Sequence, residues 1–292
     1  MTTDGLTTAR SVVITGASTG IGEACALRLD RNGWRVFAGV RKEADGQRLQ
    51  GEASDRLTPV MIDVAEGASI QAAAQSVAVA LGGRGLSGLV NNAGISVNGP
   101  LEFLTPEDLR RQLEVNVVGQ VAMTQAFLPL IRKAGGRIVN IGSIGGKMAT
   151  PFIGPYNASK FAMEALTDAL RQELRPWRIQ VAIVEPGSIA TPIWEKGMRG
   201  AEEMEKNMPE EGVRLYGKAF AAMREAAARF ERAGIPPDAV AKFVEHALTA
   251  SRPKTRYIVG RDAQLQRVIA RVVPDRMRDG LVARMLGLPR EA

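Results

Sequence analysis

The sequence predicts an α/β protein with a doubly wound parallel sheet of about seven strands, helices on both faces and a helical C-terminal extension. Short apolar runs alternate with helix-like segments along the 292 residues. The runs are apolar on both faces, as strands buried between two helix layers are, and their parallel pairing requires right-handed crossovers. The predicted strands are 12–15, 36–39, 60–62, 89–91, 138–142, 181–185 and 257–260.

A glycine-rich turn follows the first predicted strand and precedes a helix-like run. Glycine permits a tight turn and lets the backbone approach a pyrophosphate closely, while the helix N-terminus offers free N–H groups. The alternative is a purely structural turn, but the order strand, turn, helix favours a dinucleotide site. The predicted site residues of this turn are Gly16, Ser18, Thr19, Gly20, Ile21 and Gly22.

The second predicted strand ends in Arg41 and Lys42, with no carboxylate at its end. An acid at this place typically binds the adenosine ribose of NAD, whereas an arginine accommodates the 2′-phosphate of NADP. The sequence therefore predicts NADP(H) as the cofactor. NAD(H) stays open, because Glu43 or Asp45 can bend back to a ribose, and the basic pair is alternatively a solvated surface pair.

Three polar residues near the fifth strand form a candidate catalytic set. Tyr156 and Lys160 stand four residues apart at the start of a long helical stretch, so they share one helix face. We expect the ammonium to lower the pKa of the phenol and make it a proton donor and acceptor. Ser143 follows the fifth strand at the carboxyl edge, where ligands of such sheets bind, and can hydrogen-bond the reacting oxygen.

These motifs together resemble the short-chain dehydrogenase/reductase family. The resemblance covers residues 12–191 and implies a Rossmann-type fold and hydride transfer between a nicotinamide cofactor and an alcohol or carbonyl. The glycine and Tyr–Lys spacings differ from those of the extended and enoyl-reductase members, which favours alcohol–ketone or alcohol–aldehyde interconversion. The matching motifs are Thr15-Gly16-x-x-x-Gly20-x-Gly22, Asn91-Asn92-Ala93-Gly94, Asn116, Ser143, Tyr156-x-x-x-Lys160 and Pro186-Gly187.

The resemblance also implies a role for each matched residue. Tyr156 would be the acid/base, Ser143 would orient the substrate oxygen, and Lys160 would hold the nicotinamide ribose and lower the pKa of Tyr156. Asn116 would complete a proton relay through water. The resemblance further implies that Asn91, Ala93 and Gly94 line the adenosine side and support the central strand. The other implied cofactor residues are Asp63 and Val64 at the adenine, and Pro186, Gly187, Ile189 and Thr191 at the nicotinamide.

The last third of the chain predicts helices around the substrate. Helical spacing over 192–232 predicts an insertion that covers the substrate, and 261–292 predicts an amphipathic extension that Pro274 divides into two helices. Residues 235–260 resemble the steroid- and retinol-type members, which implies a lipophilic substrate. We expect the apolar stripe of the extension to pack on its own domain or a partner subunit, with an anionic membrane surface as the less favoured alternative.

Composition sets the remaining expectations. Hydrophobic residues make up 45% and charged residues 24%, and no repeat or linker divides the chain, so 1–292 is expected to be one domain. The lone Cys25 is expected to be a buried structural thiol, and the lone His246 has no companion ligands, so no catalytic metal is predicted.

Charge and termini bear on partners and location. The net charge of +7 is scattered, without an aromatic-interleaved basic stripe, so nucleic acid is not an expected partner. The start lacks a secretory signal, which makes the cytoplasm the default location. The resemblance implies a homodimer or homotetramer that acts on a small molecule. The alternative function is a non-catalytic dinucleotide-binding regulatory or structural protein.

Overall fold

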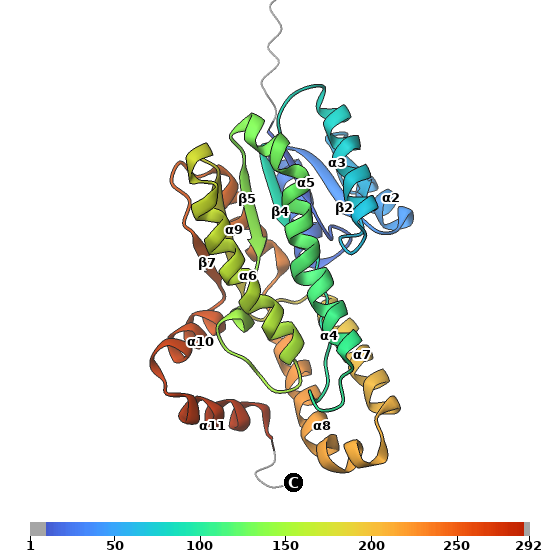
Figure 1. Ribbon diagram of the computed structural model, residues 1–292, viewed down its shortest axis with the longest axis vertical. Helices are drawn as coiled ribbons and strands as arrows, with labels where there is room; N and C mark the ends of the chain where they lie inside the picture. Colours follow the sequence, from blue (N-terminus) through green and yellow to red (C-terminus); the bar gives the residue numbers. More distant parts are fainter. Residues whose placement is uncertain (1–9, 289–292) are drawn as a thin grey trace, which may run out of the picture.

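The computed structural model describes residues 10–288 and shows one parallel sheet between two layers of helices (Figure 1). The seven strands have the order β3-β2-β1-β4-β5-β6-β7, and the predicted doubly wound fold is confirmed. The order reverses between β1 and β4, where parallel α/β sheets form ligand sites at their carboxyl ends. The strands are β1 (Ser11–Ile14), β2 (Arg35–Val40), β3 (Leu57–Met61), β4 (Gly88–Asn91), β5 (Arg137–Ile141), β6 (Gln180–Pro186) and β7 (Arg256–Val259).

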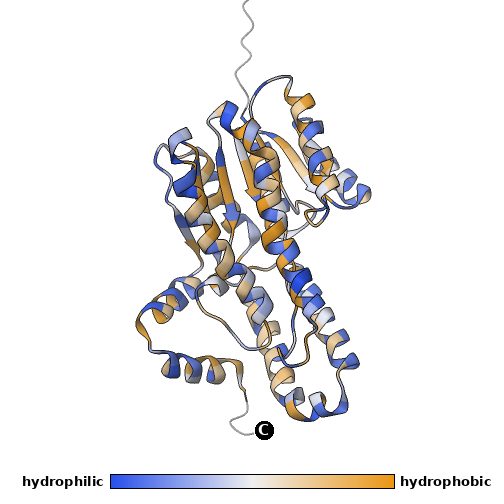
Figure 2. Cartoon of the chain, viewed as in Figure 1, coloured by the Kyte–Doolittle hydropathy of each residue, from blue (hydrophilic) through white to orange (hydrophobic). Residues whose placement is uncertain are grey.

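Two hydrophobic cores cover the two faces of the sheet, and hydrophobic residues follow the central strands (Figure 2). One core packs α1 and α9 on the sheet and contains Cys25, which is fully buried as expected. The other packs α3 and α5 on the opposite face around Phe127. The α-helices described before β7 are α1 (Gly20–Arg31), α2 (Glu43–Gly51), α3 (Gly67–Leu81), α4 (Pro106–Leu113), α5 (Gly119–Ala134), α6 (Gly154–Glu173), α7 (Ile193–Asn207), α8 (Glu210–Arg232) and α9 (Pro237–Thr249).

The third strand begins at Leu57, three residues before the predicted 60–62 segment. It includes Pro59, which lies opposite Ala38 of β2. This is physically acceptable because β3 is the edge strand, where a residue without an N–H need not donate to a further neighbour.

The last third of the chain extends the fold beyond the carboxyl ends of the strands. The helices α7 and α8 contact each other there and form the predicted helical insertion (Figure 1). The extension forms α10 (Arg261–Val272) and α11 (Asp275–Leu286), which Pro274 separates as predicted. Within the described residues, no helix combines the length and the apolar character that a membrane crossing needs.

The extension packs on its own chain along part of its surface. Val282 and Leu286 of α11 are buried in a separate hydrophobic cluster, together with Ala226 of α8 and with Met148 from the loop after β5. The outer face of α10 exposes Leu265, which is 62% accessible, and neighbouring apolar residues. The favoured packing of the stripe is therefore found for α11, while contact of α10 with a partner subunit stays a prediction.

Candidate active site

A cavity of about 380 Å³ opens at the carboxyl ends of β1, β4, β5 and β6. The insertion and the extension close its other side, with residues of α7, α8 and α11 in the wall. Ser143 lies in this wall together with most of the predicted cofactor residues. Those cofactor residues are Gly16, Ser18, Thr19, Gly20, Ile21, Arg41, Asp63, Val64, Ala93, Gly94, Tyr156, Lys160, Pro186, Gly187, Ile189 and Thr191.

Three predicted cofactor residues lie outside the cavity wall. Lys42 is exposed at the start of α2, away from the cavity. Gly22 lies in α1, where an added Cβ would stand 2.2 Å from the carbonyl oxygen of Gly16. Gly22 therefore allows α1 to pack on the glycine turn, and it contributes to the site by shaping that turn.

Asn91 is the third predicted cofactor residue that lies outside the cavity wall. Its side chain is buried, and its amide donates to Asn140 Oδ1 at 2.9 Å and to Thr124 Oγ1 at 3.0 Å. These bonds join β4 to β5 and α5, so Asn91 supports the central strand, as the resemblance implied, but does not line the adenosine side.

The next residue, Asn92, holds the glycine turn in place. Its Nδ2 donates to the carbonyl oxygens of Thr15 at 2.9 Å and Gly16 at 3.1 Å. Gly16 has a φ of +63°, a conformation that favours glycine, and an added Cβ would come within 2.9 Å of Ala93 Cα. Asn92 is part of the motif Asn91-Asn92-Ala93-Gly94, but no role was predicted for it from the sequence. The packed turn leaves an open backbone cradle that fits a dinucleotide pyrophosphate.

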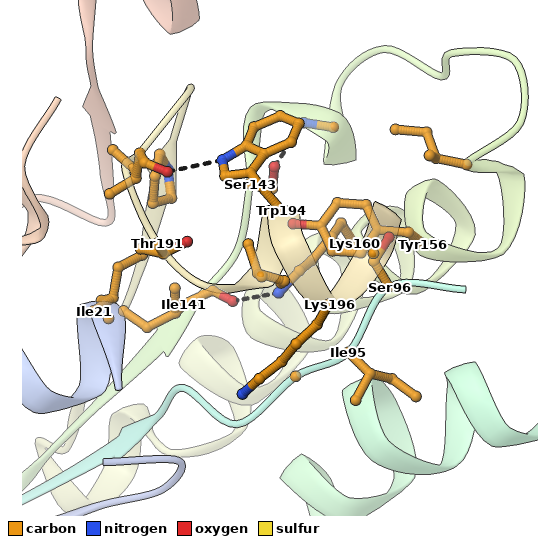
Figure 3. Close-up of a pocket in the computed structure, with 18 of the residues that line it drawn as sticks. Ile21, Ile95, Ser96, Ile141, Ser143, Tyr156, Lys160, Thr191, Trp194 and Lys196 are labelled. Atoms are coloured by element: carbon orange, nitrogen blue, oxygen red, sulfur yellow. Dashed lines mark hydrogen bonds between the residues drawn. The ribbon is translucent and has the colours of Figure 1, made fainter. Parts of the chain in front are cut away.

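Ser143, Tyr156 and Lys160 face the same cavity from two elements (Figure 3). Ser143 caps a short 3-10 turn, Ile144–Gly146, and its Oγ accepts a hydrogen bond from the Gly145 N–H at 3.0 Å. Tyr156 and Lys160 come from the first turns of α6, which begins at Gly154. The sequence motif thus becomes one compact set at the end of β5.

The expected lowering of the Tyr156 pKa does not occur in the polypeptide by itself. Burial raises the pKa of the phenol, and the Ser143 hydroxyl lowers it by a smaller amount. The ammonium of Lys160 donates to the carbonyl oxygen of Ile141 at 2.8 Å and lies 5.6 Å from the centroid of the Tyr156 ring. The lysine is directed at a backbone acceptor, and with its pKa raised by burial the phenol keeps its proton at neutral pH.

Lys160 is itself shifted by its surroundings. The residue is 5% exposed, and burial lowers the pKa of its ammonium to about 8. Among the described residues no carboxylate forms an ion pair with it, and only the hydrogen bond to the Ile141 carbonyl oxygen offsets part of the lost hydration. A lysine with such a pKa can exchange a proton near neutral pH.

Asn116 lies in a π-helical turn, Glu114–Val118, between α4 and α5. It is fully buried; its Nδ2 donates to the Ile95 carbonyl oxygen at 3.0 Å and to Ser159 Oγ at 3.1 Å, and its Oδ1 accepts from the Ile95 N–H at 2.8 Å. Both amide hydrogens are therefore used within the protein. Asn116 fixes a wall of the cavity, and its predicted part in a water relay stays a prediction.

The substrate side of the cavity is mostly apolar. From the sequence, only the segment 192–232 was predicted to cover the substrate, without individual wall residues. Trp194 is held over the cavity by a 2.8 Å bond from its Nε1 to the Ile189 carbonyl oxygen. Helical spacing predicted that α7 and α8 cover a site, but it did not identify which side chains turn inward. The apolar residues in this part of the wall are Ile95, Ile144, Met148, Ile153, Ile193, Trp194, Met198, Met223, Phe230, Met285 and Leu286.

The charges of the cavity suit an anionic ligand. Asp63 is the one carboxylate among the described lining residues, whereas the lining cations are Arg41, Lys160, Lys196 and Arg224. Arg224 pairs with Glu205 at 2.7 Å, so its charge is largely compensated. A search of residues 10–288 finds no group of three His, Cys, Asp or Glu side chains arranged to hold a metal ion.

The fold, the glycine turn and the Ser–Tyr–Lys set define an NAD(P)-dependent oxidoreductase of alcohols and carbonyls. The model of the short chain dehydrogenase family matches residues 10–201, and the chain belongs to this family. The predicted family is thereby confirmed.

Relatives of known function and known structure are similar over nearly the whole chain. The NADPH-dependent 3-dehydrocapnine reductase of Ornithobacterium rhinotracheale is 35% identical over 92% of this chain and 95% of its own length. Retinol dehydrogenase 5 of Mus musculus is 37% identical over 96% and 90%. A short chain dehydrogenase from Burkholderia cenocepacia, solved in complex with NADP, superposes with a TM-score of 0.71 at 28% identity, over 95% and 98% of the two chains.

Proposed function

We propose that the protein is an NADP(H)-linked oxidoreductase that interconverts an alcohol and a ketone or aldehyde on a lipophilic substrate. The observation that carries this proposal is the convergence of Ser143, Tyr156 and Lys160 on one cavity, between a dinucleotide cradle and an apolar wall. A bound nicotinamide would supply or accept the hydride there.

Side chains of the protein itself carry out the proton transfer. The phenol of Tyr156 is protonated at neutral pH, since burial raises its pKa, and it can therefore donate its proton to the oxygen of a carbonyl that is being reduced. The hydroxyl of Ser143 orients the same oxygen. Lys160, with a pKa of about 8, is the nearby group that returns a proton to the phenolate.

Several features support NADP(H) over NAD(H). Arg41 lines the cavity at the end of β2, whereas Glu43 and Asp45 lie in the first turn of α2 and do not line it. A guanidinium at this end of the site is the group that binds a 2′-phosphate. A relative that is NADPH-dependent by name agrees with this preference.

The lipophilic substrate is inferred from the wall opposite the cradle. Methionine, isoleucine and aromatic side chains from α7, α8 and α11 form it, and flexible methionines adapt to irregular apolar ligands. Relatives named as retinol dehydrogenases have the same type of substrate. The homodimer or homotetramer and the cytoplasmic location stay predictions.

A fluorescence titration with NADPH and NADH tests the cofactor proposal, with Arg41→Ala beside the wild type and Lys42→Ala as the matched control outside the cavity. We expect NADPH to bind more tightly than NADH, and Arg41→Ala to weaken NADPH roughly tenfold or more because a charge-assisted hydrogen bond is lost. Lys42→Ala is expected to change little. Equal loss in both variants would contradict the role of Arg41. Binding of nucleotide without turnover of any carbonyl in a panel of retinal-like and steroid-like compounds would favour a non-catalytic protein.

A further inference from the structure

A partly buried group of charged residues lies behind the cavity wall and has no part in the proton chemistry above. We call it the β6 charge cluster. It joins the loop that follows Ser143, the helix α6 and the strands β6 and β7. Its members are Lys147, Glu164, Asp168, Glu185 and Arg256.

Lys147 is the cation that connects the loop to α6 and to β6. Its Nζ lies 2.6 Å from Glu164 Oε2 and 3.6 Å from Glu185 Oε1. Arg256 closes the cluster from β7, with its Nε 3.1 Å from the same Glu164 oxygen and 3.5 Å from Glu185 Oε1. Its NH2 pairs with Asp168, which also pairs with Arg171.

The cluster is unusually costly for the fold. The side chain of Glu185 is 0% exposed, and neither of its oxygens has a hydrogen-bond partner among the described residues. Removing such a charge from water costs several kcal/mol, which ion pairs rarely recover in full. A purely apolar filling would serve stability at least as well. The arrangement therefore calls for an explanation beyond stability.

The position of the cluster supplies that explanation. Glu164 stands one helical turn after Lys160 on α6, and Glu185 directly precedes Pro186 and Gly187 of the cofactor wall. The loop that carries Lys147 lies tightly on α6, since a Cβ at Gly146 would come within 2.8 Å of the Lys160 carbonyl oxygen. The cluster thus connects all three segments that form the reaction centre.

A second attachment holds the other side of the same loop. The Nδ2 of Asn157 donates to the Gly145 carbonyl oxygen at 2.8 Å, and its Oδ1 accepts from the Thr150 N–H at 3.0 Å. Asn157 and Lys147 therefore fix the loop at two points. These two attachments restrain the loop that begins at Ser143.

We propose that Lys147 is a positioning residue for the reaction: by bridging Glu164 and Glu185, it holds the Ser143 loop against Lys160 and the Pro186–Gly187 wall. This inference rests on the proposed function of Ser143, Tyr156 and Lys160. A misplacement of about 1 Å near the reacting atoms can cost about a hundredfold in rate, so even a small release of the loop is measurable.

The protonation of Glu185 gives the inference a specific signature. Burial and the neighbouring Glu164 raise the pKa of Glu185 to about 7, while Lys147 and Arg256 oppose the rise. Asp168 and Arg171 are the other charged groups that reach the cluster. Ionised Glu185 binds Lys147, so kcat is expected to fall as the pH drops through about 7. Removal of Lys147 takes away the partner of the ionised carboxylate, so this limb is expected to be lost.

The test measures kcat, KM and NADPH affinity against pH for Lys147→Met, Lys147→Arg and Glu185→Gln, with the exposed Lys133→Met as the control. We expect Lys147→Met to lower kcat roughly tenfold or more with NADPH affinity nearly unchanged, and Lys147→Arg to recover most of the loss. The acid limb should disappear in both Lys147→Met and Glu185→Gln, because each variant removes one partner of the same ion pair. A melting curve for each variant verifies folding, and the Glu185→Gln profile decides the matter if Lys147→Met does not fold.

Two results would overturn the inference. The first is an unchanged kcat and pH profile in Lys147→Met, or an acid limb that persists in Glu185→Gln, while Tyr156→Phe is inactive. In that case the proposed function stands and Lys147 has no positioning role. The second is turnover that survives Tyr156→Phe, which refutes the proposed function and the inference together.

Discussion

Replacing Lys160 with methionine should change how the stability of the protein depends on pH. The ammonium is buried without a carboxylate partner, and its pKa falls from 10.5 to about 8 on folding. Between these two values the unfolded chain binds more protons than the folded one, so stability rises with pH. Methionine has a similar length and no charge, so this dependence is removed.

The size of the effect follows from the shift. A difference of about 2.5 pKa units corresponds to about 3 kcal/mol of destabilisation that is fully present below the folded-state pKa. Between pH 7 and pH 9.5 the wild type should recover about 2 kcal/mol of this amount relative to Lys160→Met. The lost bond to the Ile141 carbonyl oxygen shifts the variant by a nearly constant amount, so the pH dependence isolates the ammonium.

Urea unfolding followed by the fluorescence of the three tryptophans measures this difference at each pH in the absence of nucleotide. Lys133→Met, which removes an exposed lysine near the end of α5, is the control and should parallel the wild type. Parallel curves for the wild type and Lys160→Met would refute the reasoning, because the ammonium would then keep its hydration in the folded state.

Three further predictions address the cradle, the core and the extension. Gly22→Ala places a methyl 2.2 Å from the Gly16 carbonyl oxygen, so NADPH affinity should fall about tenfold or more and the melting temperature should drop, whereas Gly51→Ala, with open space around it, should do neither. Phe127→Ala empties a fully buried site and should cost about 3–5 kcal/mol in urea unfolding; a loss below about 1 kcal/mol would contradict the packing. Truncation after Pro274 removes Met285 and Leu286 from the wall, and should raise KM for a bulky apolar carbonyl while NADPH affinity is kept; an unchanged KM would show that α11 does not contact substrate.

The sheet was predictable because its strands are apolar on both faces and the turns between them contain glycine. The largest shift of a strand start, three residues at β3, depends on the edge position of Pro59, and strand order is a tertiary property that local sequence does not contain. The break between α10 and α11 was predictable because proline stops a helix wherever it occurs.

The candidate site was predictable where residues follow one another along the chain and not where distant segments meet. Tyr156 and Lys160 share a helix, so their proximity follows from spacing, but the bond from Lys160 to Ile141 that changes the electrostatics depends on packing. The motif Asn91-Asn92 does not reveal which asparagine reaches the turn, since neighbouring strand residues point to opposite faces. The pairing of Arg256 with Glu164, 92 residues apart, has no local signal at all.

The most direct test of the central claim is the consumption of NADPH by the wild type and by Tyr156→Phe in the presence of retinal-like and steroid-like carbonyls. The account predicts turnover by the wild type and a loss of about a hundredfold or more in Tyr156→Phe, with NADPH affinity kept, because only the proton donor is removed. Equal turnover by both proteins, or binding of neither NADPH nor NADH by the wild type, would contradict it.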